Sequence, residues 1–104
     1  MTPYCVVLAT ASNAAEAKKI SRVLLQEKLA ACVNVVPKIS SSYWWRGKIE
    51  TASESLLVIK TKKSLVSNLI RKIKKIHSYS IPEVIALPII EGNRDYLAWM
   101  KKSV

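Results

Sequence analysis

The sequence contains very little glycine, histidine and cysteine, and each shortage argues against a class of function. Two glycines among 104 residues leave no Gly-rich loop that could cradle phosphates and no G-x-S-x-G nucleophile elbow. His77 is the only histidine, so a Ser-His-Asp triad is not indicated. Cys5 and Cys32 have a spacing that matches no zinc or redox motif, and they are interpreted as small buried hydrophobes. These shortages predict a protein that is not an enzyme.

Acidic residues are also scarce, with 7 against 17 lysines and arginines and a net charge of +10. This charge favours an anionic partner such as nucleic acid, acidic lipid or a phosphorylated ligand, or it serves solubility alone. Apolar runs stay well short of the about 18 residues that a membrane span needs. The first residues lack the basic start of a signal peptide, so we expect a cytoplasmic protein. The length predicts a single domain over residues 1–104.

The stretch 31–61 predicts one long β-hairpin. Gly47 can take the positive φ of a tight turn, and β-branched and aromatic residues lie on both sides of it. If both arms pair fully, each has about 15 residues and a length of roughly 50 Å. A compact chain of this length is only roughly 33 Å across, so the tip at 43–45, with its tyrosine and two tryptophans, should project and be covered by another chain. Alternatively, Pro37 breaks the first arm into two short strands.

The other segments extend this hairpin to a β-α-β-β-α-β order with a terminal helix, which is the ferredoxin-like α+β arrangement. Right-handed crossovers would place both helices on one sheet face and leave the other face for a second sheet or subunit. The predicted elements are a strand over 4–11, a helix from an Asn13–Glu16 capping box to about Lys28, the hairpin, a helix capped by Ser64 and ended by the break at 78–82, an edge strand over 83–90 that tolerates Pro88, and a helix over 94–102.

Five segments together carry a family resemblance: KLAACVNVVP (28–37), YWWRGKIE (43–50), SLLVIKTK (55–62), HSYSIPEVIALPI (77–89) and GNRDYLAW (92–99). They resemble the CutA proteins, named for divalent-cation tolerance, and occur in that family's order and spacing over nearly the whole chain. The resemblance implies a ferredoxin-like homotrimer in which neighbouring hairpins pair, with a role in the tolerance of divalent cations, copper among them. The architecture also resembles the trimeric PII-like signalling proteins, so the alternative function is binding of a phosphorylated small molecule between subunits.

His77, Cys32 and Glu83 form the candidate metal site. Imidazole, thiolate and carboxylate together suit copper, zinc or another divalent cation. The resemblance shows which donors this chain has in a different form. Family members credited with copper binding can have a thiol at the position of Ala9 and a second histidine at that of Ile76, and neither donor is present here. The family's H-P-Y-E segment also reads H-S-Y-S here. The other interpretation places His77 at a helix C-terminus, where a positive charge suits the helix dipole.

Lys60 lies in an otherwise apolar strand, and a buried lysine needs a partner. In one interpretation Lys60, Tyr79, Glu83 and Trp45 converge with Glu54 on a cleft for a small anionic ligand. In the other, Glu83 or Glu54 of a neighbouring subunit pairs with Lys60 and fixes the assembly. Nucleic acid is the less favoured partner, since the sheet lacks the paired aromatics of RNA-binding domains.

Overall fold

The computed structural model describes residues 2–104, which form a four-stranded sheet and three α-helices. The strand order is β2-β3-β1-β4, and every neighbouring pair is antiparallel. The predicted α+β order of elements is therefore confirmed. The elements are β1 (Tyr4–Ala11), α1 (Ala14–Gln26), β2 (Cys32–Trp45), β3 (Lys48–Lys62), a 3-10 turn η1 (Lys63–Leu65), α2 (Val66–Ile76), β4 (Val84–Pro88) and α3 (Arg94–Ser103).

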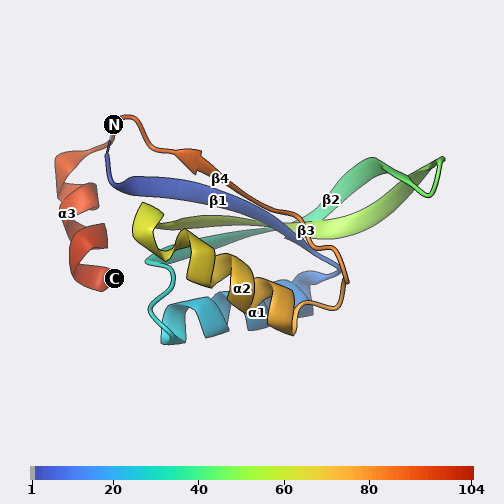
Figure 1. Ribbon diagram of the computed structural model, residues 1–104, viewed down its shortest axis with the longest axis horizontal. Helices are drawn as coiled ribbons and strands as arrows, with labels where there is room; N and C mark the ends of the chain where they lie inside the picture. Colours follow the sequence, from blue (N-terminus) through green and yellow to red (C-terminus); the bar gives the residue numbers. More distant parts are fainter. Residues whose placement is uncertain (1) are drawn as a thin grey trace.

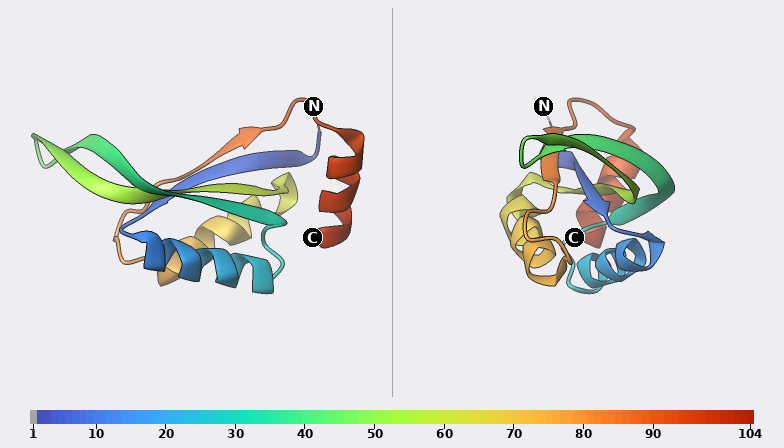
Figure 2. Two further views of the ribbon diagram at one scale, coloured as in Figure 1. Left: turned by 180° about the vertical axis from the view of Figure 1, so that it is seen from behind. Right: turned by 90° about the vertical axis from the view of Figure 1, so that its right-hand side faces the viewer.

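Helices α1 and α2 lie side by side against one face of the sheet, as Figures 1 and 2 show. Alternate residues of β1 and β3 point into this layer, which is the pattern of a strand with one covered face. On α2, Leu69 and Ile73 are fully buried four residues apart, as the predicted apolar stripe requires. The core also contains Val7, Ala9, Ile20, Leu24, Leu57 and Ile59.

The opposite sheet face lies outside the α1 and α2 layer. Residues paired in register share a face, so Leu8 lies between Val58 on β3 and Ile85 on β4. Ile85 and Leu87 on the edge strand β4 are both exposed. Helix α3 stands across one end of the sheet (Figure 1). We name this surface the open face; its apolar residues are Val6, Leu8, Val36, Leu56, Val58, Ile85 and Leu87.

Strands β2 and β3 form the predicted long hairpin, which projects beyond the rest of the chain (Figure 1). Trp45 pairs with Lys48, and the two residues between them have positive φ, 50° at Arg46 and 78° at Gly47. Positive φ at both positions is characteristic of a type I′ turn, whose twist matches that of paired strands. The chain measures 44 × 26 × 23 Å along its principal axes. The tip carries Trp44, which is 72% exposed.

Pro37 lies in a β-bulge and does not end β2, so the alternative of two short strands is wrong. From Val36 to Ile39, β2 advances three residues while β3 advances two, from Leu56 to Glu54. The extra residue places Pro37 where no ladder hydrogen bond is needed, and Lys38 adopts a left-handed φ of 58°. Beyond the bulge, the odd-numbered residues of β2 face the side that the even-numbered residues face before it.

Helix α1 begins and ends with side-chain and backbone caps. The Asn13 side chain accepts a 2.8 Å hydrogen bond from the Glu16 backbone N–H, so the predicted N-cap is confirmed. At the other end, the Lys28 N–H donates to Leu25 O and the Leu29 N–H to Leu24 O, at 3.1 and 2.8 Å. This pair of bonds is a Schellman motif, and Lys28 occupies its left-handed position with φ of 57°.

Ser64 does not cap α2, which corrects the prediction from sequence. The chain leaves β3 through η1, and neither Lys62 before η1 nor Leu65 before α2 makes a side-chain cap. A 3-10 turn at a helix start tightens the backbone without needing a capping hydroxyl. Strand β4 has the predicted edge position, with Pro88 as its last residue, but it is shorter than the segment 83–90.

Candidate functional site

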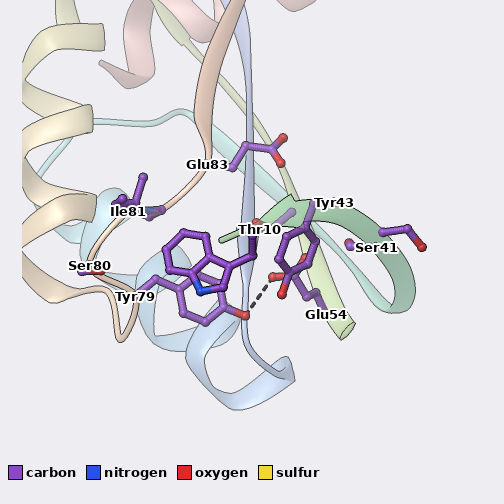
Figure 3. A pocket seen from close by; sticks show the side chains of 11 residues that line it. Thr10, Ser41, Tyr43, Glu54, Tyr79, Ser80, Ile81 and Glu83 are labelled. Atoms are coloured by element: carbon purple, nitrogen blue, oxygen red, sulfur yellow. Dashed lines mark hydrogen bonds between the residues drawn. The ribbon is translucent and has the colours of Figure 1, made fainter. Parts of the chain in front are cut away.

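A cleft of about 810 Å³ lies where the hairpin, the end of β1 and the α2–β4 loop meet (Figure 3). The hairpin and loop are far apart in sequence, and β1 separates them in the sheet order. The hairpin contributes Ser41, Ser42, Tyr43, Trp45 and Glu54, β1 contributes Thr10, and the loop contributes Tyr79, Ser80, Ile81, Pro82 and Glu83.

The central contact of the cleft joins the Tyr79 hydroxyl to the Glu54 carboxylate. Tyr79 Oη donates to Glu54 Oε2 at 2.8 Å, and Glu54 is only 7% exposed (Figure 3). Burial, together with the hydrogen bond to the Glu54 carboxylate and its charge, raises the pKa of Tyr79 to about 12. Tyr79 therefore stays protonated near neutral pH and presents a hydrogen-bond donor to Glu54.

The register of the hairpin tip determines which hairpin residues reach the cleft. Tyr43 pairs with Glu50, and Trp45 pairs with Lys48, so both share a face with Glu54. The bulge at Pro37 lets these odd-numbered residues share that face with the even-numbered residues of β2 before it, such as Val36. The aromatic wall of the cleft therefore continues the open face of the sheet across the bulge.

His77 holds the loop that carries Tyr79. Its Nδ1 accepts from the Tyr79 backbone N–H at 3.0 Å, and its Nε2 lies 2.7 Å from Thr10 O. Since a backbone N–H can only donate, Nδ1 is the acceptor and Nε2 donates to Thr10, which defines a neutral tautomer. The side chain has 0% exposure and is the C-cap residue of α2. Both ring nitrogens are thus occupied within one chain.

Glu16 fixes the other side of the same loop. Its carboxylate accepts from the Ser12 N–H at 2.9 Å and from the Ser78 N–H at 2.8 Å, joining the start of α1 to the loop after α2. Burial raises the pKa of this carboxyl, but the hydrogen bonds from Ser12 and Ser78 outweigh it and lower the pKa to about 2. Glu16 is therefore ionised at neutral pH and well into the acidic range.

Four of the five residues predicted for a ligand cleft line this one: Tyr79, Glu83, Trp45 and Glu54. Lys60 does not. It lies farther along β3 and donates to the Asn34 side chain on β2. Sequence reasoning missed Thr10 and Ser41, and it assigned Tyr43 only to the projecting tip. Their convergence depends on strand register and on the bulge, whose only signal in the sequence is Pro37.

The predicted metal set is not gathered within one chain. Among residues 2–104 no three His, Cys, Asp or Glu side chains lie close enough to hold a metal ion. Cys32 pairs with Lys60, which in turn pairs with Val6 near the start of β1. His77 contacts Thr10, near the other end of β1, so the two side chains lie at different ends of the sheet. Glu83 alone of the three lines the cleft.

The charge of the cleft favours a cation over the small anion of one of the two interpretations from sequence. Two carboxylates, Glu54 and Glu83, line it, and its lining within residues 2–104 includes no lysine or arginine. Carboxylate, phenol and hydroxyl oxygens form a donor set for a hard or borderline divalent cation.

Comparison with known proteins places the chain in a family. The profile of the CutA1 divalent ion tolerance proteins matches residues 5–103. The chain is 50% identical over 101 residues to the chloroplastic protein CutA 1 of Oryza sativa, covering 97% of this chain and 57% of that protein. It is 43% identical over 98 residues to the divalent-cation tolerance protein CutA of Thermus thermophilus, covering 94% and 95%. The chain thus spans little more than half the length of the plant relatives it matches.

Solved structures give the same result. The crystal structure of CutA1 from Oryza sativa is similar with a TM-score of 0.95 at 50% identity, covering 98% of this chain and 94% of that one. The Thermus thermophilus structure has a TM-score of 0.94 at 42% identity, covering 96% and 97%. None of the helices within residues 2–104 is both long and apolar enough to cross a membrane. The chain belongs to the CutA1 divalent ion tolerance protein family.

Proposed function

We propose that this protein acts in divalent-cation tolerance as a ferredoxin-like homotrimer that binds a divalent cation in the cleft between the hairpin and the α2–β4 loop. The observation that supports this most directly is Glu54, a nearly buried carboxylate that shares the cleft with Glu83, in a lining to which residues 2–104 contribute no lysine or arginine. A buried carboxylate without a cationic partner is costly, and a bound cation would offset that cost.

The available donors are oxygens. Glu54 uses one carboxylate oxygen to accept from Tyr79, and Glu83 and the serine hydroxyls lie around the same space. Such a set suits Mn²⁺, Mg²⁺ or Ca²⁺ better than a soft ion. Copper binding by His77, Cys32 and Glu83 stays a prediction. It would need donors from a neighbouring subunit and the release of one of the two hydrogen bonds of His77.

Two exposed apolar surfaces support an assembly of several chains. The hairpin tip exposes Trp44 and Ile49, and the open face exposes Ile85 and Leu87. Apolar patches of this kind mark interaction sites on stable proteins. We expect light scattering during gel filtration to give three times the chain mass of 11.6 kDa. A monomer at micromolar concentration would contradict the trimer.

The cation site is tested by calorimetric titration of Mn²⁺ and Cu²⁺ into the purified, metal-free protein. Glu54→Gln keeps the shape and an acceptor for Tyr79 but removes the charge, so we expect at least tenfold weaker Mn²⁺ binding. Glu91→Gln, an exposed carboxylate outside the cleft, is the matched control and should leave the affinity unchanged. Equal Mn²⁺ affinity in wild type and Glu54→Gln would refute the cleft site.

His77→Ala and Cys32→Ala separate the copper prediction from the cleft. Loss of Cu²⁺ binding in both variants, with Mn²⁺ binding kept, would assign copper to a second site shared between subunits. The alternative, a PII-like sensor of a phosphorylated ligand, is less favoured by a cleft that two carboxylates line. Absence of catalysis also stays a prediction. So does a cytoplasmic location, since two plant relatives are named as chloroplastic.

A further inference from the structure

A second cavity, of about 660 Å³, lies at the opposite end of the sheet from the candidate cleft, where β1 begins and β3 ends. Segments far apart in the sequence form it: the first residues of β1, the β3–η1–α2 junction and helix α3. The polar residues that line it are Tyr4, Lys62, Lys63, Ser64, Ser67 and Lys101. None of them belongs to the cation cleft.

Three lysines from three elements converge on this cavity. Lys62 ends β3, Lys63 begins η1 and Lys101 lies in the last turn of α3. Within residues 2–104 no carboxylate lines the cavity, and none of the three lysines forms an ion pair. Like charges gathered without a counter-charge repel one another, and an anion bound among them would remove that repulsion.

Tyr4 supplies an independent sign of a ligand. Its side chain is only 7% exposed, and its hydroxyl has no hydrogen-bond partner in the described chain. Since no fully enclosed polar side-chain atom among residues 2–104 lacks a partner, this hydroxyl must reach an open space. The cavity is the hollow that Tyr4 lines. Tyr4 is thus a nearly buried residue that lines the cavity and carries an O–H donor with no partner in the described chain.

Two serines add hydroxyl donors to the lysines. Ser64 and Ser67 both line the cavity, and Ser64 makes no cap of η1 or α2, so its hydroxyl is not used by the helix.

We propose that this cavity, which we name the lysine cavity, is a binding site for a diphosphate group, free as pyrophosphate or carried on a larger molecule. The reason for two phosphoryl groups is charge. One phosphoryl group carries about −1.5 to −2 near pH 7, which leaves one of three ammonium groups without a counter-charge. A diphosphate matches all three. Hydroxyl donors from Tyr4, Ser64 and Ser67 complete a set in which every polar side chain can donate.

The test is calorimetric titration of inorganic pyrophosphate into the purified full-length protein at low salt, with inorganic phosphate as a second probe. We expect pyrophosphate to bind at least tenfold more tightly than phosphate, with affinity that falls as salt rises. Lys62→Gln and Lys101→Gln should each weaken pyrophosphate binding about tenfold, because each removes one charge-assisted contact. Tyr4→Phe should weaken it several-fold.

Lys102→Gln is the matched control, because it makes the same charge change one residue along α3 but outside the cavity lining. We expect its pyrophosphate affinity to equal that of wild type. No measurable pyrophosphate binding by the wild type would overturn the proposal. Equal losses of affinity in Lys101→Gln and Lys102→Gln would also overturn it, since equal losses are the behaviour of a basic surface with no specific site. Melting curves confirm that each variant is folded. Glu54→Gln should leave pyrophosphate binding unchanged, which separates this site from the cation cleft.

Discussion

Glu16 gives the sharpest test of how the loop after α2 is held. Its carboxylate accepts from Ser12 and Ser78, and its side chain is 12% exposed. Folding lowers its pKa from 4.5 to about 2. At about 1.4 kcal/mol per pKa unit, the ionised carboxylate contributes up to about 3 kcal/mol to the free energy of unfolding near neutral pH. Residual exposure reduces this, so we expect Glu16→Gln to cost about 2 kcal/mol at pH 7.

The pH dependence fixes the sign of this effect. A lowered pKa in the folded state stabilises the protein above the ordinary value, and that contribution is lost as pH falls from about 4.5 to about 2. The difference between wild type and Glu16→Gln should therefore be constant above pH 5 and shrink below it. Urea unfolding at fixed protein concentration, followed by circular dichroism from pH 2 to 7, measures this difference without mass-action effects.

Glu27→Gln is the control on the same helical segment. Glu27 pairs with Lys72 at 3.0 Å, but its side chain is 47% exposed, so we expect a loss of less than about 1 kcal/mol. If Glu16→Gln costs no more than Glu27→Gln at pH 7, the assignment of Glu16 as the link between α1 and the loop is incorrect. A difference that persists unchanged at pH 2 would refute the role of its charge.

Two further predictions concern single residues of the fold and the cleft. Lys28→Gly should raise the free energy of unfolding by about 0.5–1 kcal/mol, because glycine adopts the left-handed position of the Schellman motif without steric cost. The control Lys19→Gly, in the exposed interior of α1, should lower the free energy of unfolding by about 1 kcal/mol. Equal effects of the two substitutions in urea unfolding would refute the reasoning. Tyr79→Phe should lower the free energy of unfolding by about 1–2 kcal/mol, because it removes a hydrogen-bond donor from the buried Glu54. The ultraviolet titration step of tyrosine near pH 12 should also disappear. A titration identical to that of wild type would show that Tyr79 does not have the raised pKa.

The sequence predicts elements whose signals are local and repeated. The strand over 4–11, the helix capped by Asn13 and the hairpin turn at Gly47 all follow from hydrophobic period or from turn and cap chemistry, which act within a few residues. Ser64 shows the limit of such signals. A serine before an amphipathic run is typical of a cap, but here the chain enters α2 through a 3-10 turn, whose geometry the hydroxyl does not determine.

The cleft was predictable only in part, because it depends on register. Glu54 and Tyr79 were identifiable as polar residues within or next to apolar segments, and they do meet. Lys60 was assigned to the same cleft, but six residues along β3 separate it from Glu54, which is about 20 Å at strand rise. The lysine cavity also joins both ends of the chain, and spacing in sequence gives no indication that Tyr4 and Lys101 lie together.

The bulge in β2 has a consequence for how such proteins can diverge. The tight turn fixes the pairing of the tip, from Trp45 with Lys48 back to Ile39 with Glu54, while packing fixes the pairs up to Val36 with Leu56. A one-residue deletion at Lys38 would therefore remove the bulge and leave Tyr43 and Trp45 on the same face as Glu54. Lineages can thus gain or lose this residue without exchanging the row of side chains that lines the cleft. Changes in the aromatic content of the cleft have to come from substitutions at the tip.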